Sequence, residues 1–225
     1  MQESKIENLI CDGAFSYMQP YFYNHPYALR CELGIGDEEY MATAKKRAGE
    51  IYDILFPGGA DAIIFNYWIF DYSESGEAKK IEYEEWECDP NERIQNTLEE
   101  EMEQLKFLLE YQTQYRHFSV RNLKTYSTFD EIYSGKLRRN RIVCYSDGTP
   151  FDHRALIELQ INGKGHEIGF VSFLNECILS VYDDRGCDIV FATHEKMKEF
   201  YPKLKSYFLD YDKEEMEQRF HNSKK

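Results

Sequence analysis

The sequence lacks the residue spacings that a disulfide framework or a metal site requires. Its 225 residues include six cysteines and six histidines, but no Cys-x-x-Cys pair and no His-x-x-x-His pair. Cysteines scattered in this way predict free thiols packed inside a protein of a reducing compartment. We therefore expect no disulfide and no bound metal.

Motifs for binding a nucleotide or activating a serine are also missing. Gly58 and Gly59 are not followed by the lysine and hydroxyl residue of a phosphate-binding loop, and Gly163-x-Gly165 lacks a third glycine. No Gly-x-Ser-x-Gly segment is present. The sequence therefore predicts no cofactor.

Long apolar runs are absent as well, and none approaches the roughly 18 residues that a membrane helix needs. The segment Met1–Lys5 has neither the basic residues nor the following apolar stretch of a secretion signal. We expect a cytoplasmic protein.

Positive charge is scarce. Lys and Arg total 27 against 41 Asp and Glu, so the formal net charge is −14. Such a surface repels phosphate backbones and anionic membranes, so we expect neither nucleic acid nor a membrane as partner. It attracts basic proteins and speeds their association, although acidity also serves solubility alone.

The sequence shows no repeats and no linker long enough to divide the chain, so we expect one domain over residues 1–225. Tyr27–Leu33 alternates like a half-buried strand, a helix capped by Asp37 follows, and the apolar run 62–70 predicts a central strand, the pattern of a βαβ unit. The C-terminal third predicts an antiparallel meander between helices. We therefore expect an α/β or α+β fold, with a mixed sheet, an antiparallel C-terminal meander and flanking helices. The three strands of the meander are expected within Ile168–Leu174, Ile178–Tyr182 and Ile189–Ala192.

Acidic residues are concentrated between Glu82 and Glu103, where ten of them stand against one basic residue, Arg93. A helix here would present either a docking surface for a basic protein or a solvated face that pairs loosely with the basic stretch 116–141. We expect Glu99, Glu100 and Glu103 to face solvent and Ile94, Leu98, Met102 and Leu105 to face inward.

The segment Val181–Val190 predicts a hairpin with more charge than its turn needs. Asp183 and Asp184 suit the start of a turn, and Gly186 suits a residue of positive φ at its end. Arg185 and Asp188 exceed that need and predict a local ion-pair network. The cluster is either a turn closed by an ion pair or a site for a cation, a catalytic carboxylate pair or a recognition tip.

Two further pairs are candidates on weaker grounds. Cys187 and His194 could form a nucleophile with its base, but no cysteine-enzyme motif surrounds them. Arg30 and Glu32 share one face of a predicted strand, where an exposed or a cross-strand ion pair is the ordinary outcome. If both prove buried, they become a site.

These strings resemble a bacterial family, the domain-of-unknown-function family 3885. Residues 182–188, reading Tyr-Asp-Asp-Arg-Gly-Cys-Asp and followed by an apolar strand and a helix with Tyr201, are similar to its hairpin. Residues 29–34 resemble its Arg-x-Glu-Leu-Gly strand, and residues 43–56 resemble the helix after that strand. The resemblance spans about residues 20–210. It implies no established activity, but small acidic bacterial proteins of this kind are often immunity partners of secreted toxins.

We therefore expect a cytosolic interaction protein, most concretely an immunity-type protein that binds a basic toxin through its acidic surface, with aromatic anchors. The alternatives are a structural homodimer and an enzyme. An enzyme needs a cleft at the hairpin and at least one carboxylate with a raised pKa, whereas a binding protein needs an exposed acidic face with aromatic residues and no cleft. The enzyme would use Asp183, Asp184, Arg185 and Asp188.

Overall fold

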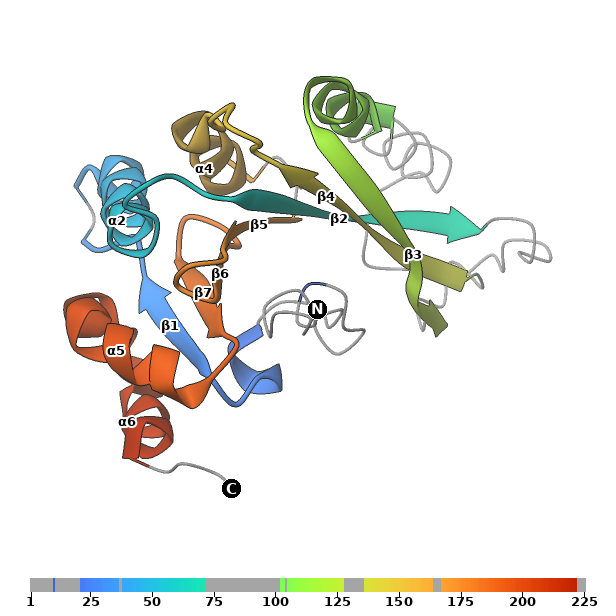
Figure 1. The fold of residues 1–225 in the computed structure, drawn as a ribbon. Coiled ribbons are helices and arrows are strands. Elements are labelled where there is room, and N and C mark those ends of the chain that lie inside the picture. Colours follow the sequence, from blue (N-terminus) through green and yellow to red (C-terminus); the bar gives the residue numbers. More distant parts are fainter. Residues whose placement is uncertain are drawn as a thin grey trace, which may run out of the picture.

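The structure is a computed structural model of the chain (Figure 1). It describes residues 10, 21–36, 38–71, 102–103, 105–127, 136–163 and 167–221. In those parts of the chain, no helix has the length and apolar character needed to cross a membrane.

Seven strands form one sheet in the order β1-β7-β6-β5-β2-β4-β3. Each of the six pairings is antiparallel. The α+β class and the C-terminal meander β5-β6-β7 are thus confirmed, while the described strands include no parallel pair that would make the sheet mixed. The strands are β1 (Ala28–Glu32), β2 (Ala62–Asp71), β3 (Arg116–Ser127), β4 (Lys136–Tyr145), β5 (Glu167–Ser172), β6 (Cys177–Val181) and β7 (Gly186–Phe191).

The expected βαβ unit is present in a split form. β1 is followed by helix α2 (Tyr40–Leu55) and then by β2. Because four antiparallel pairings separate β1 from β2 in the sheet, the two strands run in the same direction. The meander fills the space between them, and every step across the sheet therefore remains antiparallel.

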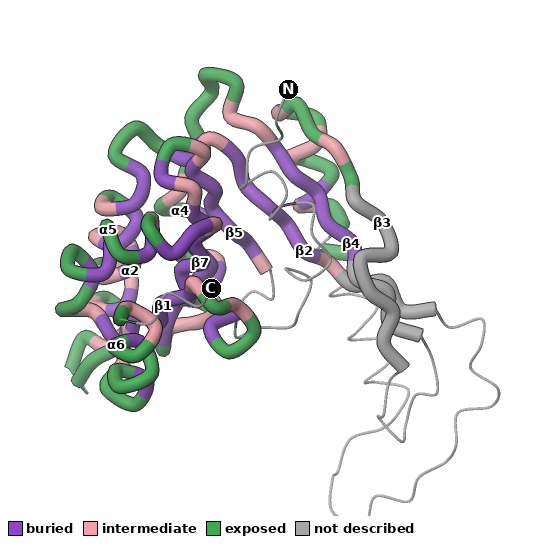
Figure 2. Tube along the Cα trace, turned by 60° about the horizontal axis from the view of Figure 1, so that its bottom comes forward, coloured by how far each residue is buried: buried purple, intermediate pink, exposed green. Residues whose placement is uncertain are grey.

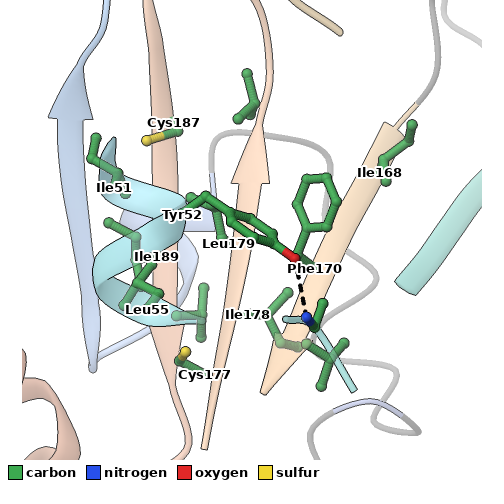
Figure 3. Packing of buried hydrophobic residues seen from close by; sticks show 14 of the residues in the cluster. Ile51, Tyr52, Leu55, Ile168, Phe170, Cys177, Ile178, Leu179, Cys187 and Ile189 are labelled. Atoms are coloured by element: carbon green, nitrogen blue, oxygen red, sulfur yellow. Dashed lines mark hydrogen bonds between the residues drawn. The ribbon is translucent and has the colours of Figure 1, made fainter. Parts of the chain in front are cut away.

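Helices cover one face of the meander. α2 packs on α4 (His153–Ile161), and Figure 3 shows Tyr52 and Leu55 of α2 over the meander strands. The ring of Tyr52 lies 5.1 Å from that of Phe170 in β5, edge to face. Near β7, α5 (His194–Leu204) stacks Phe200 on Phe191 at 5.6 Å.

The other face of β1 and β7 is covered by the short helical turn η2 (Tyr21–Asn24) and by the C-terminal segment. Tyr21 accepts a hydrogen bond from Asn66 of β2 at 3.0 Å. Met216 of α6 (Lys213–His221) is fully buried, and its sulfur accepts from the backbone N–H of Arg30 at 3.3 Å. Hence β1 is buried on both faces and is not the half-buried strand expected from its alternation (Figure 2).

Of the three α-helices whose N-cap the structure describes, two are capped by a side chain. The side chain of Asp152 accepts from the N–H of Ala155 and caps α4, and Thr193 caps α5 in the same way. The expected cap of α2 is wrong, because α2 is preceded directly by Glu39, which has a left-handed φ of 55° and makes no side-chain cap bond. Asp37 itself lies outside the described residues.

Candidate functional site

Two of the three segments that resemble the family, residues 29–34 and residues 182–188, meet at one end of the sheet. β1 and β7 are neighbours, and their register places Arg30 opposite Asp188 and Glu32 opposite Gly186. Just beyond, the backbone N–H of Leu33 donates to the carbonyl of Arg185 at 2.9 Å. We call residues 30–34 together with residues 182–188 the motif end.

Arg30 and Asp188 form a buried ion pair. The Nε and Nη2 atoms of Arg30 lie 2.9 and 3.4 Å from the two carboxylate oxygens. Arg30 is 6 % exposed and Asp188 0 %. The backbone N–H of Phe22 donates to the same carboxylate at 3.0 Å, and Asp212 accepts from Nη1 of Arg30 at 3.4 Å. The pair therefore joins two strands to η2 and to the C-terminal segment.

Strand register explains why this pair is close. Leu33 and Arg185 are joined by a backbone hydrogen bond, so the antiparallel alternation makes Arg30 and Asp188 a non-hydrogen-bonded pair. Side chains are nearer to each other in such pairs, with Cα atoms about 4.5 Å apart. Arg30 and Asp188 thus meet on the same face of the sheet without bending either strand.

Aromatic rings enclose the guanidinium group. Its central carbon lies 4.6 Å from the ring centre of Tyr23, 5.3 Å from that of Phe22 and 5.7 Å from that of Tyr182. Such contacts stabilise a cation where water is excluded. The Tyr23 hydroxyl also donates to Asp212 at 3.0 Å, which orients the second carboxylate.

Burial raises the pKa of the Asp188 carboxyl, although Arg30 and the N–H of Phe22 act to lower it. Burial acts to lower the pKa of Arg30, but its hydrogen bond and attraction to Asp188 raise it overall. A raised carboxyl pKa is one mark of a catalytic acid. Asp188 nevertheless has no exposed surface with which to meet a substrate.

The remaining charges of the hairpin lie on its exposed turn. The carboxylate of Asp183 accepts from the backbone N–H and from the Nε of Arg185, both at 2.8 Å. The side chain of Arg185 is 77 % exposed. The predicted ion-pair network is therefore present but divided: Asp183 and Arg185 pair outside, whereas Asp188 pairs with Arg30 inside.

The expectation of a positive φ at Gly186 is wrong. Among the described glycines, four have a positive φ and Gly186 is not one of them; it is the first residue of β7. Glycine is required at position 186 for another physical reason. A Cβ there would collide with the Tyr182 hydroxyl and would lie 2.8 Å from the carbonyl oxygen of Cys31. Close packing, not turn geometry, requires glycine at this position.

The chain matches, over residues 9–212, the family described as domain of unknown function (DUF3885). It belongs to this family. The match includes the whole motif end and Asp212 of the C-terminal segment. No curated protein and no solved structure matches the chain.

In this DUF3885 protein Arg30 forms a cross-strand ion pair, one of the two outcomes expected for it, and its partner is Asp188 rather than Glu32. Arg30 turns to Asp188, and Glu32, at the end of β1, has no ion-pair partner within the described ranges. The backbone carbonyl of Glu32 accepts from the Nε of Arg47 at 2.9 Å. Sequence reasoning missed Tyr23 and Asp212, because no spacing rule links η2 or the C-terminal segment to β1.

The described cysteines are free and buried. The Cys187 thiol pairs with that of Cys31, and this contact and burial raise its pKa well above the usual range. His194 instead bonds through Nε2 with the carbonyl of Arg219 at 2.9 Å, so no Cys–His pair forms. Of the described side chains, no group of three His, Cys, Asp or Glu is placed to hold a metal ion. The four described cysteines are Cys31, Cys144, Cys177 and Cys187.

The helix described at residues 102–103 and 105–114, which we call the acidic helix because it follows the acidic run, differs from the expected orientation. Met102 and Leu105 were expected inward but are 57 and 50 % exposed. The inward side carries Phe107, Leu108 and Tyr111, because Phe107 and Tyr111 pack on Phe65 of β2 at 5.5 and 4.9 Å. Glu103 is exposed as expected. Glu99, Glu100, Ile94 and Leu98 lie outside the described residues.

A groove of about 380 Å³ lies between α2 and α4, away from the motif end. His153 stacks on Tyr52 with ring centres 4.1 Å apart and planes 1° from parallel. Burial lowers the pKa of this imidazole. Lys45 and Glu158 form an ion pair between the two helices. The residues that line the groove include side chains of both charges, and some of these are already paired with each other. The lining residues are Lys45, Lys46, Gly49, Glu50, Asp53, His153, Arg154, Ile157 and Glu158.

Proposed function

We propose that this DUF3885 protein binds a basic protein partner and, most concretely, neutralises a basic toxin as its immunity protein. The observation that carries the proposal is the division of the charged hairpin. Its carboxylate with the raised pKa, Asp188, is enclosed and paired, whereas Asp183, Asp184 and Arg185 reach the surface. That arrangement suits recognition at a surface better than proton transfer to a substrate.

The overall charge supports the same proposal. A net charge of −14 accelerates encounter with a positively charged protein at low ionic strength and weakens encounter with nucleic acid. Exposed tyrosines, such as Tyr211 at 86 %, provide the large, rigid side chains that often anchor a protein interface.

The test is affinity capture with the tagged full-length chain from a lysate of its host, at about 50 and about 300 mM salt, one on either side of physiological ionic strength. We expect a basic protein that is retained at low salt and reduced at high salt. The purified partner should then bind directly, and if it is a toxin, co-expression should restore growth of cells that produce it. Recovery of no basic protein at low salt contradicts the proposal.

A further inference from the structure

The β1–α2 loop and the β6–β7 turn lie side by side at the end of β1. The N–H of Leu33 bonds to the carbonyl of Arg185, and Gly34 leaves room for the ring of Tyr40. The charges of Asp184 and Asp183 add to burial in raising the pKa of Tyr40, which places the turn beside the start of α2. We call residues 33–36, 38–41 and 183–185 the loop–turn corner.

Exposed apolar side chains are found at this corner. Ile35 is 44 % exposed and Met41 is 39 % exposed, although both lie within a few residues of the buried Leu33 and the half-buried Tyr40. Apolar side chains surrounded by polar residues are typical of the centre of a protein interface.

The same corner carries three carboxylates that have no ion pair among the described residues. These are Glu38, Glu39 and Asp184, and the one basic residue of the corner, Arg185, is already paired with Asp183. Acidic residues at the start of α2 also favour its helix dipole. That benefit does not explain Asp184, or why Ile35 and Met41 are left in water.

The corner is held rigidly from below. The buried ion pair of Arg30 with Asp188 joins β1 to β7 a few residues before the corner. Gly186 has no Cβ and so leaves room for Tyr182, whose ring packs on Arg30. A surface that is already ordered loses less entropy when it binds.

We propose that the loop–turn corner is the surface that receives the partner, and that the partner presents arginine or lysine beside an apolar side chain. This inference rests on the proposed function, and it names a surface other than the acidic run Glu82–Glu103. Charge complementarity selects the basic residues, and exposed Ile35 and Met41 select the apolar one.

Two triple variants with the same net charge distinguish the effect of the corner on binding from the effect of the overall charge. The corner variant carries Glu38→Lys, Glu39→Lys and Asp184→Lys. The control variant carries Glu103→Lys, Glu195→Lys and Glu214→Lys, which change exposed acids elsewhere that have no ion pair in the described structure. Both variants bring the net charge from −14 to −8.

The probe is a fluorescent 12-residue peptide of alternating arginine and leucine, and its Kd is measured by anisotropy at low salt. We expect the corner variant to lose at least about tenfold in affinity and the control variant less than about threefold, because only the first removes local contacts. Ile35→Ser should weaken binding by a factor that salt does not change. Urea denaturation checks that each variant remains folded, and hydrogen exchange of the wild type should show protection at residues 33–41 on peptide binding.

Equal losses in the two variants, or a wild type that does not bind the peptide, overturn the corner as the docking surface. Those results leave the proposed function standing if affinity capture still recovers a basic protein. Failure of the capture experiment instead removes the proposed function itself, whatever the peptide shows.

Discussion

Arg30 joins three segments of the chain that are distant in sequence. It contacts Asp188 in β7, Asp212 in the C-terminal segment and Tyr23 in η2. Burying two charges costs free energy that their attraction only partly returns, so such a pair adds little net stability compared with an apolar replacement. Removing one partner is different, because it leaves the other charge buried alone.

Replacing Asp188 by asparagine should therefore lower the free energy of unfolding by about 3–5 kcal/mol. Arg185→Ala removes an ion pair from the exposed turn and should cost less than about 1 kcal/mol. Urea denaturation of both variants measures the difference. Similar values for the two would show that the buried pair contributes no more than the exposed one.

Gly186 allows a test between two explanations of one glycine. If close packing requires it, Gly186→Ala should destabilise the protein by about 1–3 kcal/mol, since a Cβ would collide with the Tyr182 hydroxyl. Tyr182→Phe removes that hydroxyl and should recover part of the loss in the double variant. The recovery is expected to be partial, because the ring carbon Cζ of residue 182 and the Cys31 carbonyl stay 2.7 and 2.8 Å from the new Cβ. A requirement for positive φ would give no recovery at all.

At the scale of elements, local patterns identified most helices and strands but not what covers them. Alternation in β1 correctly placed Arg30 and Cys31 on opposite faces, yet it predicted one solvated face. That face is covered by η2 and α6. Met216 of α6 contacts Arg30 although the two residues are far apart in the sequence, and η2 is held by Asp188 of β7, which is likewise distant from it. Periodicity distinguishes the two faces of a strand, but it cannot show that a segment distant in the sequence covers the polar face.

The acidic helix illustrates a second limit. Its leucines and methionine suggested one stripe, but the structure buries the neighbouring stripe with Phe107 and Tyr111. Aromatic side chains bury more area each than Leu or Met. Where two stripes compete on one helix, the aromatic content decides the orientation, and a simple count of apolar positions does not.

His153 links α4 to α2 and makes stability depend on pH. Burial against Tyr52 lowers its pKa from 6.5, so the folded state binds a proton less readily than the unfolded state. Stability should thus fall as pH drops below about 6.5, because the unfolded chain then takes up more protons. His153→Phe keeps an aromatic ring on Tyr52 and should reduce the difference in urea midpoint between pH 7.5 and pH 5.5. His221→Gln, at an exposed site, is the control, and an equal reduction there would contradict the assignment to His153.

For the whole molecule, the class of fold was predictable and the order of strands was not. The sequence indicated a strand, a helix and another strand before a meander, but not that the meander would insert between the first two strands. Insertion is favoured because it buries both faces of β6 and β7 and covers the edge of β1 with residues 208–209. The motif end exists only through that long-range arrangement, since it joins residues 30–34 to residues 182–188.

The net charge of −14 provides the last prediction, at the scale of the whole molecule. Glu99→Lys, Glu100→Lys and Glu103→Lys together bring it to −8, which lessens self-repulsion but adds no specific contact. Because exposed charges contribute little to stability, we expect the melting temperature to change by less than about 2 °C. Calorimetry at about 50 and about 300 mM salt measures it, the two salts bracketing physiological screening, and any small gain should shrink as salt screens the repulsion. A large loss of stability would mean that these acids pair with the basic stretch 116–141 within the folded protein, and the acidic run would then be an internal electrostatic contact and not a surface open to a partner.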